Sequence, residues 1–232
     1  ALSVAVLRGS FEFQGQKCSA ASRAYIPASV WERIGSKYCA EVGKITMGDV
    51  SDFSNYIGAV IDKKSFDNIA GYIDRAKADS GCTIVTGGNY DDSVGYFVEP
   101  TTILCEDPMY ESMAQEIFGP VLSIHVYQDS EYENILTICD STSEYALTGS
   151  IFAKYREDIE FAKDALRFSA GNFYINDKPT GAVVGQQPFG GARGSGTNDK
   201  AGSPLNLLRW VSPRSIKETF APPKSWTYGF LE

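Results

Sequence analysis

The apolar residues of the chain recur with two different spacings. Helical spacing marks residues 3–16, about 30–42, 62 to about 80, 130 to about 140 and 158 to about 168. Short apolar or alternating runs predict strands at 22–26, 83–86, 97–104, 121–127, 149–153 and 172–176. Because helices separate most of these strands, the connections are expected to be crossovers. The pattern therefore predicts an α/β fold with a largely parallel sheet and flanking helices.

The amino-acid composition of the chain changes after Asp177. Residues 178–204 are rich in Gly, Pro, Ser and Thr and have no amphipathic period. Such a stretch is typical of a surface linker, but loops on an α/β scaffold are also where ligands are held. Apolar residues return between Leu205 and Phe220. We therefore divide the chain into one domain, residues 1–204, and a C-terminal tail, residues 205–232, which is a candidate for edge-strand pairing in an oligomer.

Charge and composition exclude several classes of function. Acidic residues outnumber basic ones by 29 to 21, which argues against a nucleic-acid partner. No apolar run approaches the roughly 20 residues of a membrane-spanning helix. The five cysteines are scattered and form no C-x-x-C pair, so neither a disulfide framework nor a metal site is expected. The single histidine, His125, lies in a predicted strand, which favours a structural role over one in a catalytic triad.

The first candidate for chemistry is the run Gln14-Gly-Gln-Lys-Cys-Ser19. Gly15 interrupts a predicted helix, so the chain is expected to turn there and present Cys18 at the boundary of an element. A thiolate is a strong nucleophile, and backbone N–H groups at a turn can stabilise an oxyanion. Considered alone, however, a single cysteine is more often a small buried hydrophobic residue.

Two further runs contain polar groups suited to a ligand. In Gln115-Glu-Ile-Phe-Gly-Pro120, Glu116 could accept hydrogen bonds from a hydroxyl-bearing ligand, or it could be a solvated residue before a turn. The run that begins at Gly181 is glycine-rich but has neither a Rossmann fingerprint nor a phosphate loop. The backbone N–H groups of Gly181 and Ala182 could instead hold a small anion such as a carboxylate.

Taken together and in this order, the three runs resemble those of the aldehyde dehydrogenase family. Within it they are most similar to the glutamate-semialdehyde branch, also called 1-pyrroline-5-carboxylate dehydrogenase. The resemblance runs almost from end to end and is carried by Gly15-Gln-Lys-Cys-Ser-Ala20, Glu116-Ile-Phe-Gly-Pro-Val121, Gly171-Asn-Phe-Tyr-Ile-Asn-Asp177 and residues 185–200. The element around Glu116 marks the family, and the run after Asn176 marks the branch.

The resemblance implies a function and a set of roles. It implies NAD-dependent oxidation of glutamate γ-semialdehyde to glutamate in proline breakdown, with Cys18 as the nucleophile. Glu116 and Phe118 would contact NAD, Ser19, Gly181 and Ala182 would hold the substrate α-carboxylate, and Phe189 would form a wall of the aldehyde pocket. A homo-oligomer is implied for the full-length protein, in the mitochondrial matrix or, for a bacterial protein, in the cytoplasm.

The resemblance also implies parts that this sequence does not contain. In the family a nucleotide-binding domain, an oxyanion-hole Asn and a general-base Glu precede the nucleophile. We therefore expect the chain to be a C-terminal catalytic-domain portion that is inactive alone. An alternative is a non-catalytic module that pairs with full-length subunits through its tail. A cysteine hydrolase or acyltransferase is a third possibility, but it lacks a base if His125 is structural.

Overall fold

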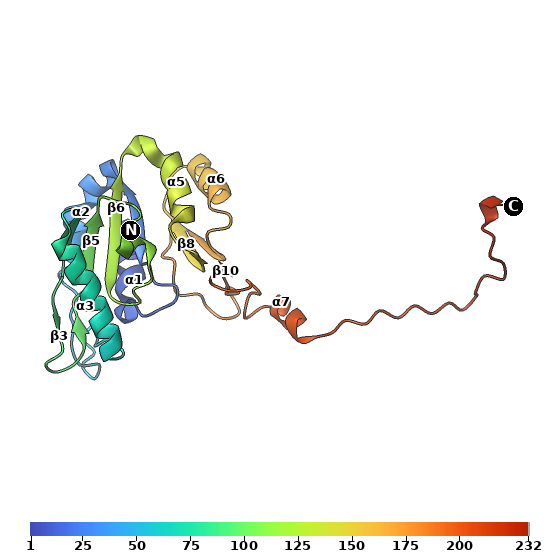
Figure 1. Cartoon of the computed structure of the whole chain (residues 1–232), viewed down its shortest axis with the longest axis horizontal. Helices are drawn as coiled ribbons and strands as arrows, with labels where there is room; N and C mark the ends of the chain where they lie inside the picture. The colour runs from blue at the N-terminus through green and yellow to red at the C-terminus, as the bar shows by residue number, and fades with distance from the viewer. Residues whose placement is uncertain (232) are drawn as a thin grey trace.

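The computed structural model describes residues 1–231, and its centre is a four-stranded sheet (Figure 1). The strand order is β1 (Arg23–Pro27), β6 (Val121–Tyr127), β5 (Thr101–Cys105) and β2 (Cys82–Thr86). Strand β6 pairs in parallel with β1 and β5, with Ala24 opposite Ile124, whereas β2 runs antiparallel to β5. The predicted α/β fold with a largely parallel sheet is confirmed.

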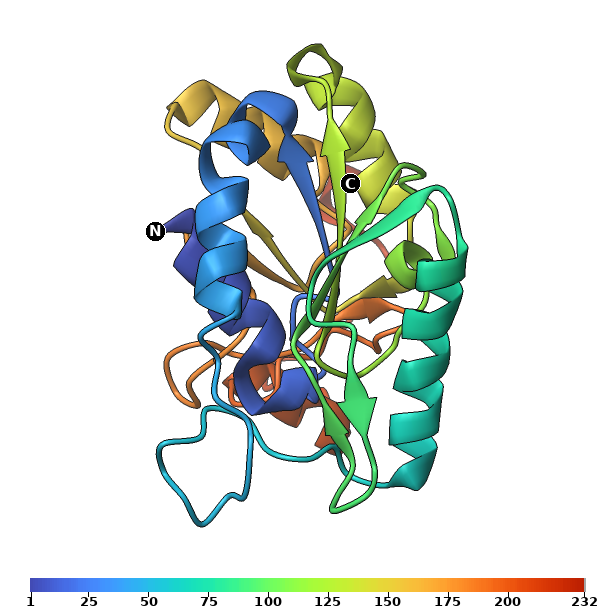
Figure 2. The same ribbon diagram turned by 90° about the vertical axis from the view of Figure 1, so that its left-hand side faces the viewer.

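Helices cover both faces of this sheet (Figure 2). The helices α1 (Leu2–Phe11) and α2 (Ala28–Val42) lie on one face, and α3 (Lys63–Ala78) lies on the other. Successive side chains of a strand point to opposite faces, so Val121 packs in the cluster under α3 while Leu122 and Ile124 pack under α1 and α2. Burial on both faces is typical of a central parallel strand, and it explains why the run at 121–127 is mostly apolar.

A second, two-stranded sheet lies beside this core. It consists of β8 (Thr148–Ile151) and β9 (Asn172–Ile175), which pair in parallel. The helices α5 (Tyr132–Ser141) and α6 (Arg156–Ala165) pack against it through a cluster that includes Leu136, Ala162 and Phe173. The loop after β9 returns to the core and contributes β10 (Ala192–Arg193), which pairs with β7 (Tyr145–Ala146).

The predicted strand at 97–104 is two strands in the structure. The first is β4 (Phe97–Val98), which pairs with β3 (Tyr90–Asp91), and the second is β5 of the main sheet. Pro100 lies between them and has no backbone N–H to donate, so one continuous ladder cannot form there. The remaining short elements are α4 (Glu111–Ala114), α7 (Pro204–Leu207) and four 3₁₀ turns: η1 (Glu12–Gly15), η2 (Asp129–Glu131), η3 (Leu208–Trp210) and η4 (Gly229–Leu231).

The predicted helix at 3–16 ends earlier than expected, at Phe11. Phe13, Gln14 and Gly15 follow with φ angles of 56°, 57° and 64°. Three consecutive left-handed residues cannot continue a right-handed helix, so the chain reverses direction. The predicted interruption at Gly15 is confirmed, but it begins two residues earlier and includes residues with side chains.

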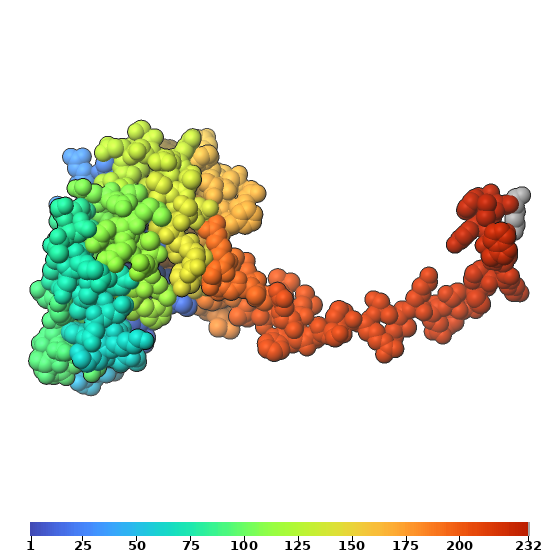
Figure 3. Space-filling view, viewed as in Figure 1, coloured from blue at the N-terminus to red at the C-terminus, as the bar shows by residue number. Residues whose placement is uncertain are grey.

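The C-terminal tail leaves the body of the molecule (Figures 1 and 3). Its first residues form α7 and η3, and the described part of the tail contains no strand, so edge pairing with a second chain stays a prediction. Large apolar side chains along it are exposed, including Trp210, Phe220 and Trp226 at 80%, 89% and 85%. Across residues 1–231, no helix combines the length and apolar character needed to cross a bilayer.

Candidate active site

Cys18 lies in the turn that follows the three left-handed residues, and its side chain is exposed. A pocket of about 110 Å³ opens beside it. Besides Cys18, the residues that line this pocket include Glu116, Phe118 and Gly119. The fold thus brings the predicted nucleophile and the two predicted cofactor-binding residues to one cavity, although they come from distant parts of the sequence.

Close backbone contact joins the two loops of this pocket. A β-carbon added to Gly15 would lie only 2.3 Å from the carbonyl oxygen of Gly119, so only glycine fits at this position. A β-carbon on Gly119 would in turn lie 2.4 Å from the side chain of Ile69. Phe118 has a positive φ of 58° and its side chain is 44% exposed. Both loops are therefore fixed by the backbone and by the core beneath them.

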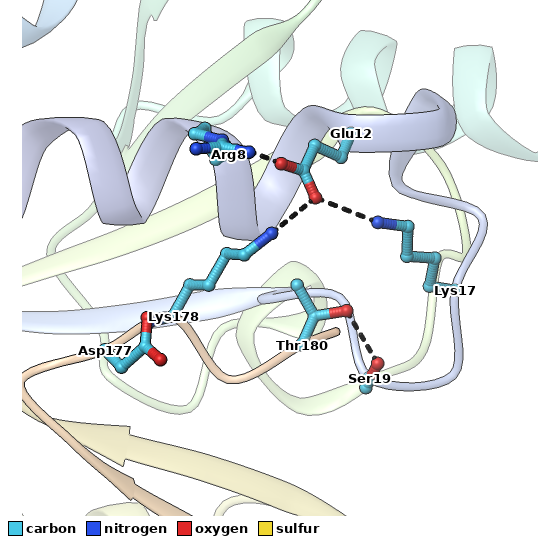
Figure 4. Close-up of polar contacts among 7 residues, drawn as sticks. All are labelled: Arg8, Glu12, Lys17, Ser19, Asp177, Lys178 and Thr180. Carbon is cyan, nitrogen blue, oxygen red and sulfur yellow. Dashed lines mark hydrogen bonds and ion pairs between the residues drawn. The ribbon is translucent and has the colours of Figure 1, made fainter. Parts of the chain in front are cut away.

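Ser19 faces a third loop. Its side chain is buried, and its Oγ lies 2.8 Å from Oγ1 of Thr180, which is also buried (Figure 4). Gly181 follows Thr180 with a φ of 89°, and Ala182 comes next. The structure therefore places the predicted carboxylate-binding residue Ser19 beside the segment that contains its two predicted partners.

Sequence reasoning missed Thr180. No spacing pattern connects a threonine in a loop to a serine 161 residues away, and the contact exists only because the loop after β9 folds back onto the turn after η1. The one available signal was its position directly before Gly181. Like Ser19, Thr180 already has a protein partner for its hydroxyl, because the two hydroxyls contact each other.

Glu12 is a second residue that sequence reasoning missed. It follows α1, and Figure 4 shows its carboxylate between three cationic side chains. Its Oε2 lies 3.0 Å from Nζ of Lys17 and 2.7 Å from Nζ of Lys178, and its Oε1 lies 2.8 Å from Nε of Arg8. The cluster joins α1, the turn that carries Cys18 and the loop that carries Gly181.

The electrostatics of this cluster favour an ionised carboxylate. Partial burial alone would raise the pKa of Glu12, because a charged group is less well solvated there. Hydrogen bonds from the three cations outweigh this effect and lower the pKa from an ordinary 4.5 to about 2. Glu12 is therefore a permanent anion under ordinary conditions.

Phe189 lies in the loop between β9 and β10, the loop that also contains Gly181. Its backbone N–H and carbonyl pair with Ala201 at 2.9 and 2.7 Å. The side chain of Asn172 donates to the carbonyl of Pro188 and accepts from the N–H of Gly190, at 3.0 and 3.2 Å. Within the described chain, the lining of the Cys18 pocket includes none of the four predicted substrate-binding residues, Ser19, Gly181, Ala182 and Phe189, so their contact with a substrate stays a prediction.

The other four cysteines differ from Cys18 in their environment. Burial raises the pKa of Cys39, Cys82, Cys105 and Cys139, and that of Cys105 reaches about 12. His125 lies in β6, where Nδ1 is 3.0 Å from the carbonyl oxygen of Cys105, and it is not among the lining of the pocket across residues 1–231. Its position agrees with the predicted structural role.

The side chains of the pocket fit a nicotinamide nucleotide. The Glu116 carboxylate is exposed, and within residues 1–231 neither a hydrogen bond nor an ion pair engages it. A free carboxylate can accept from two neighbouring hydroxyl groups, and an exposed ring such as Phe118 can pack against a planar heterocycle. Both groups line the cavity that also holds the thiol.

Comparisons with known proteins agree with this arrangement. The chain is 62% identical over 225 residues to a mitochondrial delta-1-pyrroline-5-carboxylate dehydrogenase of Dictyostelium discoideum, covering 97% of this chain and 40% of the relative. It is 50% identical to the human mitochondrial protein of the same name, with the same coverage of 97% and 40%. The chain therefore spans about 40% of the length of these relatives.

Comparison with solved structures also finds proteins named delta-pyrroline-5-carboxylate dehydrogenase. A delta-pyrroline-5-carboxylate dehydrogenase from Mycobacterium tuberculosis superimposes with a TM-score of 0.88 at 56% identity, over 100% of this chain and 43% of that one. The structure of that protein bound with NAD gives 0.86 at 55% identity, over 100% and 42%. The model of the family described as "Aldehyde dehydrogenase family" matches residues 1–216. The chain belongs to the aldehyde dehydrogenase family.

Proposed function

We propose that this chain is the catalytic-domain portion of an NAD-dependent 1-pyrroline-5-carboxylate dehydrogenase, which oxidises L-glutamate γ-semialdehyde to L-glutamate in proline breakdown. One observation carries the proposal: Cys18 shares its pocket with Glu116 and Phe118. The names and high identity of the relatives support the choice of this branch of the family.

Cys18 is the nucleophile in this proposal. Its thiolate adds to the aldehyde carbon, and the backbone N–H of Cys18 stabilises the oxyanion that forms. NAD, held by Glu116 and Phe118, supplies the acceptor for the hydride that leaves the same carbon. Water then cleaves the thioester on Cys18, which releases the acid and restores the thiol. One aldehyde, one NAD⁺ and one water give one carboxylate, one NADH and two protons.

Neutral donors hold the α-carboxylate of the substrate. Ser19, Gly181 and Ala182 supply a hydroxyl and backbone N–H groups, and the contact between Ser19 and Thr180 supports their placement in one site. Phe189 forms an aromatic wall for the aldehyde chain. Lys17 and Lys178 are not proposed as ligands, because Glu12 already engages both.

The test is turnover in a protein of the relatives' length that contains these 232 residues. NADH formation is followed by absorbance with glutamate semialdehyde as substrate. Cys18→Ser is expected to abolish turnover, and 4-aminobutanal, which differs from the substrate only by the absence of the α-carboxylate, is expected to give a much lower kcat/KM. Retention of turnover by Cys18→Ser would overturn the assignment of the nucleophile, and equal kcat/KM for the two aldehydes would overturn the carboxylate site.

The 232-residue chain alone is proposed to lack efficient turnover. The chain corresponds to about 40% of its relatives, and the resemblance assigns the general base and much of the cofactor site to the remainder. Purified chain with NAD and glutamate semialdehyde provides the measurement. Robust turnover that disappears in Cys18→Ala would contradict this part of the proposal.

A second candidate function is assembly, and the exposed tail favours it. We propose that residues 205–232 contact a second copy, because the described tail presents Leu205, Trp210 and Phe220 to solvent. The protein would be a homo-oligomer, in the mitochondrial matrix as the names of the eukaryotic relatives suggest. Light scattering of the chain with and without residues 205–232, alone and mixed with a full-length subunit, tests this. A monomer in every mixture would exclude the tail as an assembly element.

A further inference from the structure

Glu12 occupies a central place between two loops of the proposed active site. Its side chain is only 18% exposed, and its Oε2 contacts Lys17 and Lys178 at the same time. Lys17 directly precedes Cys18, and Lys178 lies three residues before Gly181. A single oxygen atom therefore joins the nucleophile turn to the loop that is proposed to hold the substrate carboxylate (Figure 4).

A second contact supports the same junction. Ser19 and Thr180 form a buried hydrogen bond. Ser19 directly follows Cys18 in the sequence, and Thr180 lies two residues after Lys178. The nucleophile turn and the 177–182 loop are thus joined at two points, one ionic and one neutral. Removal of either contact leaves the other in place, so the ionic one can be tested without separating the loops completely.

Charge makes the ionic contact depend on Glu12. The two ammonium groups lie within hydrogen-bond distance of one oxygen, so they are close to each other, and the Arg8 guanidinium is on the same carboxylate. Without the carboxylate these three cations would repel one another. Because the pKa of Glu12 is about 2, the carboxylate is ionised at neutral pH.

We propose that Glu12 is a positioning residue that fixes the Cys18 turn against the Gly181–Ala182 loop by holding Lys17 and Lys178 in one ion cluster. Glu12 does not touch the reacting atoms and acts through the two lysines. This inference rests on the proposed function for the identity of the ligand. The coupling between the loops is measurable without turnover, so a failure of the coupling and a failure of the dehydrogenase proposal are distinguishable.

The experiment measures alkylation of Cys18 by iodoacetamide in the 232-residue chain, quantified on peptides by mass spectrometry. Rates are taken at pH 8, where the lysines keep their charge, and are divided by the thiolate fraction measured by ultraviolet absorbance for each variant, so that accessibility and mobility determine the comparison. Cys39, which is half-buried in α2, is the internal reference for general loosening. The variants are Glu12→Gln, Lys178→Met and the double variant. Glu160→Gln, which removes a carboxylate shared by Arg156 and Lys163, is the matched control.

Glu12→Gln and Lys178→Met are each expected to raise the Cys18 rate, the first by about threefold or more, without changing the Cys39 rate. The double variant is expected to be no faster than Glu12→Gln, because Lys178 acts through Glu12. Glu160→Gln should change neither rate. An unchanged Cys18 rate in Lys178→Met, multiplicative effects in the double variant, or equal acceleration of Cys18 and Cys39 would overturn the proposal. If Glu12→Gln does not fold, Lys178→Met alone still decides.

Discussion

The hydroxyl oxygens of Ser19 and Thr180 lie 2.8 Å apart, although 161 residues separate them in the sequence. Both side chains are buried, so the two hydroxyls form a hydrogen bond with each other in place of hydrogen bonds to water. This contact places the residue after the proposed nucleophile beside the loop of Gly181 and Ala182.

Thr180→Val should therefore destabilise the protein. The substitution keeps the shape of the side chain but leaves the Ser19 hydroxyl buried without this partner, at a cost of about 1–3 kcal/mol. Urea denaturation gives the free energy of unfolding. Thr83→Val, at an exposed position of β2, is the control and should cost little. The double variant Ser19→Ala, Thr180→Val should lose less than the sum of the single losses; additive losses would contradict the contact.

Gly15→Ala should destabilise the protein and displace the Cys18 turn. Alanine at a φ of 64° is strained, and its β-carbon would also clash with the Gly119 carbonyl, so the cost should exceed about 1 kcal/mol. Gly185→Ala is the matched control, because Gly185 has a φ of 82° but no atom within 4 Å of the added carbon. The difference between the two unfolding free energies measures the clash, and equal values would refute the close approach.

Acid should destabilise the protein partly through Glu12. Its pKa in the folded chain is about 2, below the ordinary 4.5, so its contribution to stability is complete above pH 4.5 and declines as pH falls toward 2. Glu12→Gln should show a shallower loss of unfolding free energy across this range than the unaltered chain. Identical pH profiles would show that the Arg8, Lys17 and Lys178 contacts do not stabilise the ionised form.

Limited alkylation at pH 8 should modify Cys18 first. Its side chain is exposed, whereas burial raises the pKa of the other four thiols, to about 12 for Cys105. Peptide mapping after one equivalent of iodoacetamide should find the label on Cys18, and Cys105 should react only after unfolding in urea. Faster labelling of Cys105 in the folded chain would contradict its burial.

Glu116→Ala should weaken cofactor binding in a protein of the relatives' length. Loss of the carboxylate that we propose accepts hydrogen bonds from the ribose hydroxyls should raise the KM for NAD about tenfold or more, with a smaller effect on the KM for the aldehyde. Glu99→Ala, on a loop outside the pocket, is the control. An unchanged KM for NAD would remove Glu116 from the cofactor site.

Most elements of the fold could be predicted because their residues repeat with a clear period. The run at 121–127 and the helix at 62–80 are each buried on a well-defined surface, and the structure contains β6 and α3 at these places. The early end of α1 could not be predicted, since Phe13 and Gln14 have no local preference for positive φ and are held there by tertiary contacts.

The candidate site could be predicted in part. The short motifs identified Cys18, Glu116 and Phe118, and the structure places them around one pocket. The contact of Glu12 with Lys178 could not be predicted, because the two residues are 166 positions apart and no local sequence pattern indicates such a pairing. Local patterns thus identify reactive groups, whereas tertiary contacts decide which loops support them.

The close approach of Gly15 to Gly119 has an evolutionary consequence. The turn that carries Cys18 is positioned by a backbone contact between Gly15 and Gly119. The segment at 177–182 contacts the same region through Lys178, which binds Glu12, and Thr180, which contacts Ser19. A descendant can therefore alter Gly181 and Ala182 without disturbing this backbone contact, whereas a change at Lys178 or Thr180 also removes a support of the Cys18 turn. We expect changes of selectivity to arise most easily at Gly181 and Ala182 and least easily at Gly15, so a designer seeking a new aldehyde would begin with the first two.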